Sequence, residues 1–315
     1  MSKKKMTIAN FNIVFGDDEE PLLNYFESII LPAFRQDIIR KTNQEKYKFM
    51  DIEILEVEEG IFALKGILVK STTLEVKSKF DDNENLVDAN ELYATAPYSS
   101  FIIYLHNHRM VLIKNQKGSP DLRSFSSTVR YILYRFIHDT NKLRKENGEI
   151  PLPNAIINIV GILLEDSIFK ALNKVNKINE LKLKFYPLNG DLDFTDLFEG
   201  MTTDLRKKVG SKNGAVILKS PTSISGISEV LTAAQGTVEP TFKVTFQDKN
   251  KGTITNDRLS ENMDIDIDSD NILDATNQII EKTRKLDSII KISEGNQKIY
   301  AEKKSNILPF VKKSR

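Results

Sequence analysis

Cationic and aromatic residues recur along one predicted helix and the hairpin before it. Apolar runs at 101–105 and 110–113 predict two strands, and a Gly-Ser-Pro turn at 118–120 leads into a helix that extends to about residue 145. Arg and Lys side chains can neutralise phosphates, and Tyr can stack on bases. The sequence therefore predicts a nucleic-acid-binding surface formed by Arg109, Lys114, Lys117, Arg123, Arg130, Tyr134 and Lys142.

Two other interpretations of this pattern stay open. A solvated helix face, with Lys and Arg favoured near its C-terminal end, would show the same residues. An acidic partner protein could bind the same cations. In each case the helix is held by an apolar stripe at helical spacing, formed by Leu122, Phe125, Val129, Ile132, Leu133 and Phe136.

The tetrapeptide at 106–109 contains two of the three histidines. In a strand, His106 and His108 would point the same way and could hold a metal ion. A third ligand would have to be His138 or a distant carboxylate, because the chain has no cysteine. The position between two apolar runs favours a hairpin tip instead. We therefore predict neither a metal site nor a cofactor.

A run of acidic residues at 264–268 could suggest a metal site, but the residues around it do not match a known metal-binding loop. Asp264, Asp266 and Asp268 alternate with apolar residues, which is typical of a strand with one solvated face. An EF-hand would need Gly and Glu where Ser269 and Ala275 stand. A metal-dependent nuclease remains an alternative, in which Glu75 would act with an acid supplied by 51–53. We predict no catalytic residues, and an enzyme is the less favoured interpretation.

Composition limits the class of protein. The 315 residues are 40% hydrophobic and 28% charged, as in soluble globular proteins. Lys+Arg number 45 and Asp+Glu 44, so any basic face must be local. The absence of cysteine excludes disulfides and thiol chemistry. No signal peptide is visible and no apolar run reaches the ~20 residues of a membrane helix, so we expect a cytoplasmic protein with no membrane partner.

The first half of the chain predicts a strand, a helix and a meander. Residues 7–15 alternate, residues 16–21 start a helix, and strands are expected at 49–57, 62–69 and 73–80. A charged stretch that ends in two prolines favours a linker at 148–153. The predicted domains are therefore 1–147 and 154–315.

The second half predicts the same kinds of element. Strands are expected at 181–186, 214–219, 242–246, 253–255 and 263–268, with helices at 194–209, 223–235 and 272–290. The expected fold class is α+β, with two mixed α/β lobes that each have a mainly antiparallel sheet and packed helices. A diverged duplication of one unit is an open alternative. The last helix would pack in the core or mediate dimerisation.

The chain resembles a family of uncharacterised bacterial proteins encoded in mobile-element and phage-resistance loci. The resemblance covers most of the chain in layout and is carried by Tyr98-Ser99-Ser100-Phe101 through His108-Arg109 to Ser119-Pro120, Leu181-Lys182-Leu183 and Asn189-Gly190-Asp191. It implies a role in phage defence and supplies no catalytic residue. Our sequence-based hypothesis is a non-catalytic protein that binds nucleic acid or a partner protein and forms a homo-oligomer. The alternatives are the nuclease and a structural subunit of an oligomeric assembly.

Overall fold

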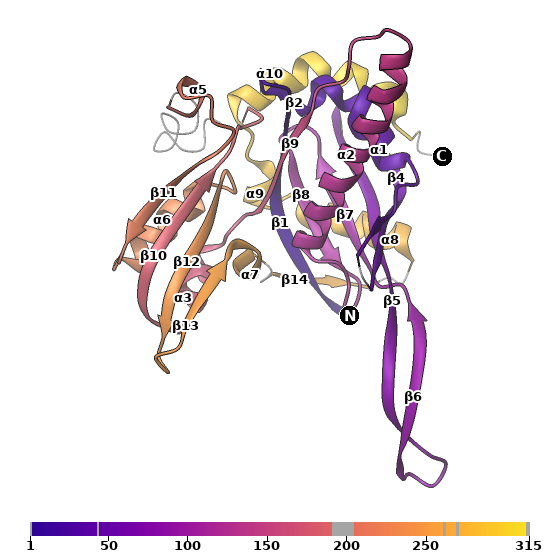
Figure 1. The fold of residues 1–315 in the computed structure, drawn as a ribbon, viewed down its shortest axis with the longest axis vertical. Coiled ribbons are helices and arrows are strands. Elements are labelled where there is room, and N and C mark those ends of the chain that lie inside the picture. The colour runs from indigo at the N-terminus through magenta and orange to yellow at the C-terminus, as the bar shows by residue number, and fades with distance from the viewer. Residues whose placement is uncertain (1, 43, 191–204, 261–262, 269–270, 313–315) are drawn as a thin grey trace.

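The protein is built on two separate antiparallel sheets. The structure, a computed structural model, describes residues 2–42, 44–190, 205–260, 263–268 and 271–312. One sheet has ten strands and the other has four, and helices pack against both (Figure 1). The α+β class with two lobes, each formed by an antiparallel sheet and helices, is confirmed.

The ten-stranded sheet, here called the large sheet, contains strands from both ends of the chain. Its strands are β1 (Ser2–Phe15), β2 (Glu20–Pro21), β3 (Arg40–Lys41), β4 (Lys46–Glu58), β5 (Ile61–Phe80), β6 (Leu86–Thr95), β7 (Tyr98–Tyr104), β8 (Arg109–Lys114), β9 (Ala155–Gly161) and β14 (Met263–Ile267). The helical elements in this half are η1 (Leu22–Tyr25), η2 (Phe26–Ile30), α1 (Leu31–Arg35) and α2 (Leu122–Glu146).

The four-stranded sheet, here called the small sheet, has the order β11-β10-β12-β13. Its strands are β10 (Val175–Phe185), β11 (Gly214–Lys219), β12 (Val238–Phe246) and β13 (Lys251–Thr255). The helices of this lobe are α3 (Glu165–Leu172), α5 (Arg206–Lys208), α6 (Ile224–Ala233) and α7 (Asn256–Ser260). The chain then ends with α8 (Ile272–Thr283), α9 (Asp287–Ile290), α10 (Glu294–Lys303), η5 (Lys304–Asn306) and η6 (Leu308–Phe310).

Strand β1 joins the two halves of the sequence. It pairs with β8 along one edge, and with β14 and then β9 along the other. Strands β9 and β14 both come after the predicted linker at 148–153. The division between the two sheets therefore does not fall at that linker, because the second half contributes two strands to the large sheet.

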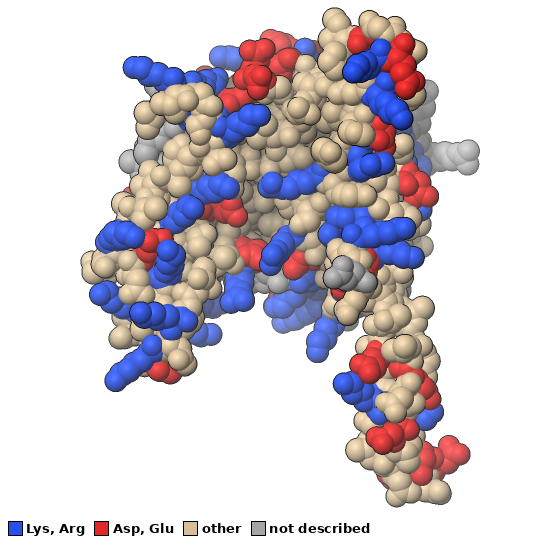
Figure 2. Space-filling view, viewed as in Figure 1, with Lys and Arg blue, Asp and Glu red and all other residues tan. Residues whose placement is uncertain are grey.

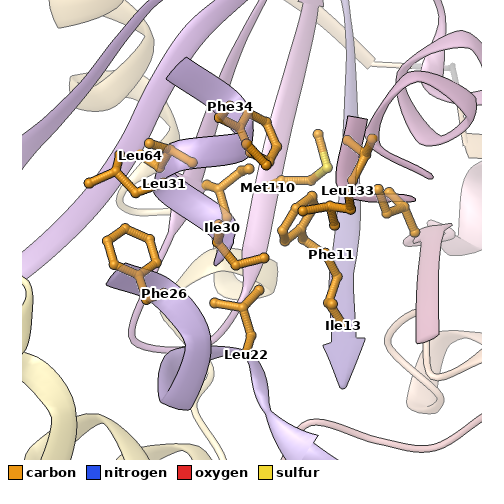
Figure 3. Packing of buried hydrophobic residues seen from close by; sticks show 14 of the residues in the cluster. Phe11, Ile13, Leu22, Phe26, Ile30, Leu31, Phe34, Leu64, Met110 and Leu133 are labelled. Atoms are coloured by element: carbon orange, nitrogen blue, oxygen red, sulfur yellow. The ribbon is translucent and has the colours of Figure 1, made fainter. Parts of the chain in front are cut away.

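The main core lies between the large sheet and the helices that cover one of its faces. Apolar residues of β1 meet those of the 22–35 helical segment, β5, β8 and α2 in one cluster (Figure 3). Helix α2 begins after Asp121, whose carboxylate accepts a hydrogen bond from the Ser124 amide at 2.8 Å. This cap directly follows the predicted turn at 118–120. The apolar stripe of α2 is buried as expected, and only Phe136 is partly exposed.

Several predicted elements differ from the structure. The strands expected at 62–69 and 73–80 are one continuous strand, β5, whose second half leaves the body and pairs only with β6. The expected helix at 272–290 is broken between α8 and α9, and α10 follows it. The helix expected at 194–209 lies mostly outside the described residues, with α5 as its described end. Across the described part of the chain, no helix is long and apolar enough to cross a bilayer.

Candidate nucleic-acid interface

Helix α2 places four of the seven predicted residues on one exposed flank. Arg123, Arg130, Tyr134 and Lys142 are all exposed, at spacings of seven, four and eight residues. The spacings of seven and four residues return Arg123, Arg130 and Tyr134 to nearly the same side of a helix with 3.6 residues per turn, and Lys142 lies about a quarter turn away from them. Within the described residues, neither Arg123 nor Arg130 takes part in a salt bridge. Both guanidinium groups are therefore available to an anionic ligand.

Tyr134 gives this flank an aromatic surface. The residue is 65% exposed, and its ring stacks on that of His138, with the ring centroids 6.0 Å apart and the planes at 27°. A shallow hollow beside it is lined by Tyr134, His138, Lys142 and Lys145. An exposed ring next to cationic side chains is the arrangement that binds single-stranded bases and their phosphates.

A groove separates α2 from the small sheet. It has a volume of about 480 Å³ and is lined on the α2 side by Arg123, Ser126 and Arg130. The opposite side is lined by Tyr186, Glu239 and Thr255 from the small-sheet lobe, by Asn256 and Asp257 of α7 and by Asn158 of β9. Figure 2 shows Lys and Arg side chains on both lobes of this face.

The small sheet has one buried face and one open face. Leu181, Leu183 and Phe242 are buried against α3 and α6, so the residues between them in the sequence point to the other side. The open face carries six lysines and continues into the groove wall, since Lys184 pairs across the strands with Glu239. The lysines are Lys177, Lys182, Lys184, Lys219, Lys243 and Lys251.

Two glutamates moderate the positive charge on the open face. The carboxylate of Glu180 accepts hydrogen bonds from the ammonium groups of Lys219 and Lys243, and the Lys219 bond is the larger cause of its lowered pKa. Glu239 accepts a hydrogen bond from the Tyr186 hydroxyl. Burial first, and then this bond, raise the pKa of Tyr186, while the nearby Arg130 opposes the rise. The face therefore keeps an excess of lysine over carboxylate.

A second basic cluster lies at the start of β1. Because β1 and β8 are antiparallel, the first residues of β1 lie beside the last residues of β8. Lys3, Lys4 and Lys5 therefore share a hollow with Lys114 and Lys117. Lys117 is exposed, whereas Lys114 is half-buried and desolvation lowers its pKa. Lys4 donates to the Asn115 side chain at 3.3 Å, and Lys5 pairs with Asp264 at 2.8 Å.

Arg109 is not part of any such surface, and its prediction as a nucleic-acid contact is wrong. Its exposed fraction is 0%. The guanidinium Nη1 donates to the main-chain oxygen of Gln235 at 2.8 Å, in the loop after α6. Arg109 is a buried structural residue because this loop and the C-terminal segment cover the turn between β7 and β8.

The same covering explains the two histidines of the turn. The turn itself is confirmed, since Tyr104 pairs with Arg109 across it. His106 packs against the Tyr300 ring, and the Asn107 amide donates to the main-chain oxygens of Ile289 and Lys291. Burial, followed by nearby positive charge, lowers the pKa of His106 to about 4 and that of His108 to about 3. Both rings are neutral near pH 7.

The carboxylates considered for a nuclease do not converge. Glu53 is paired with Lys65 at 2.7 Å and with Lys312. Glu75 lies ten residues beyond Lys65 on the same strand, which is roughly 30 Å at the usual rise of a strand. The part of the chain that the structure describes contains no group of three His, Asp or Glu residues suited to a metal ion.

Sequence analysis missed most of the residues on the small-sheet side. Lys182 and Lys184 alternate with the buried Leu181, Leu183 and Phe185, so the period-2 pattern could have placed both lysines on one open face. The three consecutive lysines at the start of β1 could also have been recognised as a basic cluster. The sequence could not show that the lysines of the small sheet lie opposite the predicted cations of α2, or that those of β1 lie beside Lys114 and Lys117. No protein-family model and no curated protein matches this chain.

Proposed function

We propose that this protein binds nucleic acid, without acting on it chemically, in the groove between α2 and the open face of the small sheet. The observation that supports this most directly is the position of Arg123 and Arg130, exposed and opposite a lysine-bearing sheet. The arginines in the groove and the lysines on the open face that continues from its opposite wall can contact phosphates of one strand or duplex. The Tyr134 and His138 rings extend the surface with a site for base stacking.

Overall neutrality is compatible with this function. The formal net charge is +1, and the groove is lined by Glu239 and Asp257 as well as by Arg123 and Arg130. The positive excess therefore comes from the lysines of the adjoining open face, and such a local positive potential is sufficient to attract phosphate. The carboxylates on the open face are each engaged by a lysine or a hydroxyl group. We infer that the ligand is recognised largely through its backbone, because arginine and lysine side chains that can neutralise phosphates predominate on α2 and on the open face.

Fluorescence anisotropy with labelled single-stranded and duplex DNA and RNA tests the proposal. We expect binding that weakens steeply between about 50 and 200 mM salt. The double variant Arg123→Glu/Arg130→Glu should lose binding, whereas Arg135→Glu should retain it. Arg135 is on the same helix, exposed and paired with Asp139 at 3.1 Å, outside the groove lining. The proposal would be refuted if the affinity did not depend on salt concentration, or if the double variant bound nucleic acid as wild type does.

The role in bacterial antiphage defence that the resemblance implies is a further part of the proposal. Its test is the efficiency of phage plating on cells with and without the gene. Protection should disappear with Arg123→Glu/Arg130→Glu and persist with Arg135→Glu. Protection that the double variant preserves would separate the defence role from the groove.

A further inference from the structure

A long two-stranded arm extends from the large sheet. The arm, residues 71–96, contains the second half of β5 and all of β6 and projects away from the body (Figure 1). Five large apolar side chains on it are more than half exposed: Leu74, Phe80, Leu86, Leu92 and Tyr93. A two-stranded ribbon is marginally stable alone in water, and contiguous exposed apolar residues commonly mark a binding surface.

Most of these side chains lie on one face of the arm. Leu74 pairs across the strands with Tyr93, and Phe80 pairs with Leu86. Leu74 and Phe80 are separated by an even number of residues on one strand, so both pairs point the same way. The arm is also acidic. It carries six carboxylates and two lysines, a net charge of −4.

A surface with the opposite charge lies at the far edge of the small sheet. Segment 205–219 holds four exposed apolar residues, Leu205, Val209, Ile217 and Leu218. It contains one arginine and four lysines, but no acid. Arg206 is buried and, like Lys207, pairs with Glu19, and Lys219 pairs with Glu180, so Lys208 and Lys212 are the cations of this segment that no described salt bridge engages. Its strand β11 pairs only with β10 among the described strands, so the other edge presents unpaired main-chain groups. An apolar edge strand readily accepts another strand.

The arm and segment 205–219 cannot meet within one chain. Figure 1 places the arm and β11 at opposite sides of the molecule, with the large sheet between them. Contact between two arms would bring two charges of −4 together, which is unfavourable. The charge pattern and the paired apolar surfaces instead match the arm of one molecule to β11 of another.

We propose that the arm docks on segment 205–219 of a second copy of this chain and adds a strand to the edge of β11. The contact is head-to-tail, since each copy uses one surface to donate and a different one to accept. Such contacts produce rings or open chains rather than two-fold dimers. Neither surface lines the groove, although Lys219 of segment 205–219 also belongs to the open face, so the assembly is tested in the absence of nucleic acid.

Light scattering after size-exclusion chromatography, in nucleic-acid-free buffer, measures the assembly. We expect the wild-type mass to exceed that of a monomer and to rise with concentration. The arm variant Phe80→Asp/Leu86→Asp and the edge variant Val209→Asp/Ile217→Asp should each be monomeric. Ile150→Asp is the matched control, because Ile150 is 83% exposed but lies on neither surface, and it should assemble as wild type does.

Mixing the two monomeric variants decides the geometry. The edge variant keeps an intact arm and the arm variant keeps an intact edge, so the mixture should form a dimer that cannot grow further. Its formation would also show that both variants are folded. A wild-type protein that is monomeric at every concentration would overturn the proposal. An arm variant that still assembles, or a mixture that yields no dimer, would do the same.

Discussion

The side chain of Arg109 donates a hydrogen bond to the main-chain oxygen of Gln235 at 2.8 Å and so connects the large sheet to the small-sheet lobe. Similar polar contacts lie nearby. The Asn12 amide donates to the oxygen of Pro187, and the Asn256 side chain bonds both the amide and the oxygen of Gly161. These buried bonds fix the two walls of the groove relative to each other. Arg109, which the sequence predicts to contact nucleic acid, instead helps to hold the two walls of the groove in position.

Replacing Arg109 should cost stability. Arg109→Ala leaves the buried oxygen of Gln235 without this donor and creates a cavity, so we expect the free energy of unfolding to fall by about 3 kcal/mol or more. Arg135→Ala removes an exposed arginine and should change it by less than about 0.5 kcal/mol. Urea unfolding followed by circular dichroism measures both. Equal effects would mean that the Arg109 contact contributes nothing to joining the lobes.

The salt dependence of binding should report how many phosphates the α2 flank contacts. If Arg123 and Arg130 each neutralise one phosphate of a duplex, their joint replacement by alanine should reduce the slope of log K against log salt by about 1.8. Anisotropy titrations at several salt concentrations measure that slope, with Arg135→Ala as the control. An unchanged slope with weaker binding would place both arginines outside direct phosphate contact.

Acid should destabilise the protein through the buried turn. His106 and His108 have pKa values of about 4 and about 3 in the folded protein, below the ordinary value of 6.5. Below pH 6.5 the unfolded chain binds protons that the folded protein does not, so stability falls as the pH falls. The loss approaches about 1.4 kcal/mol per pH unit for each ring and ends below the folded pKa.

Histidine variants isolate this contribution. His106→Gln and His108→Gln should each make the free energy of unfolding less dependent on pH between about 6.5 and 4. The measurement is a series of urea titrations across that range. The explanation fails if both variants give the wild-type slope.

Gly161 should tolerate no side chain. A Cβ added there would lie 2.2 Å from the Ser260 hydroxyl oxygen and 2.3 Å from its Cβ, where β9 meets α7. We expect Gly161→Ala to cost about 1–3 kcal/mol by overpacking. Adding Ser260→Gly should recover part of that loss, which a double-mutant cycle would detect as non-additivity. Simple additivity would indicate that the two residues do not meet as described.

The sequence by itself determined the local structure with a periodic signal. The amphipathic pattern of α2 defined both its buried stripe and the exposed flank of Arg123, Arg130, Tyr134 and Lys142, because burial follows directly from helical spacing. The same holds for the alternating strands, and hence for the α+β class. Residues 62–80 were less predictable, because β5 has an apolar first half and a polar second half and therefore seemed to be two strands.

Tertiary structure alone decided which distant segments lie together. His106, His108 and Arg109 form a polar turn that sequence reasoning would expose to solvent, yet segments about 130 to 190 residues later in the chain cover it. Strand β1 accepts β9 and β14 beside it, and the small sheet is brought opposite α2. These arrangements depend on hydrogen bonds and packing between residues far apart in the sequence. Such contacts produce no periodic pattern in the sequence of either segment.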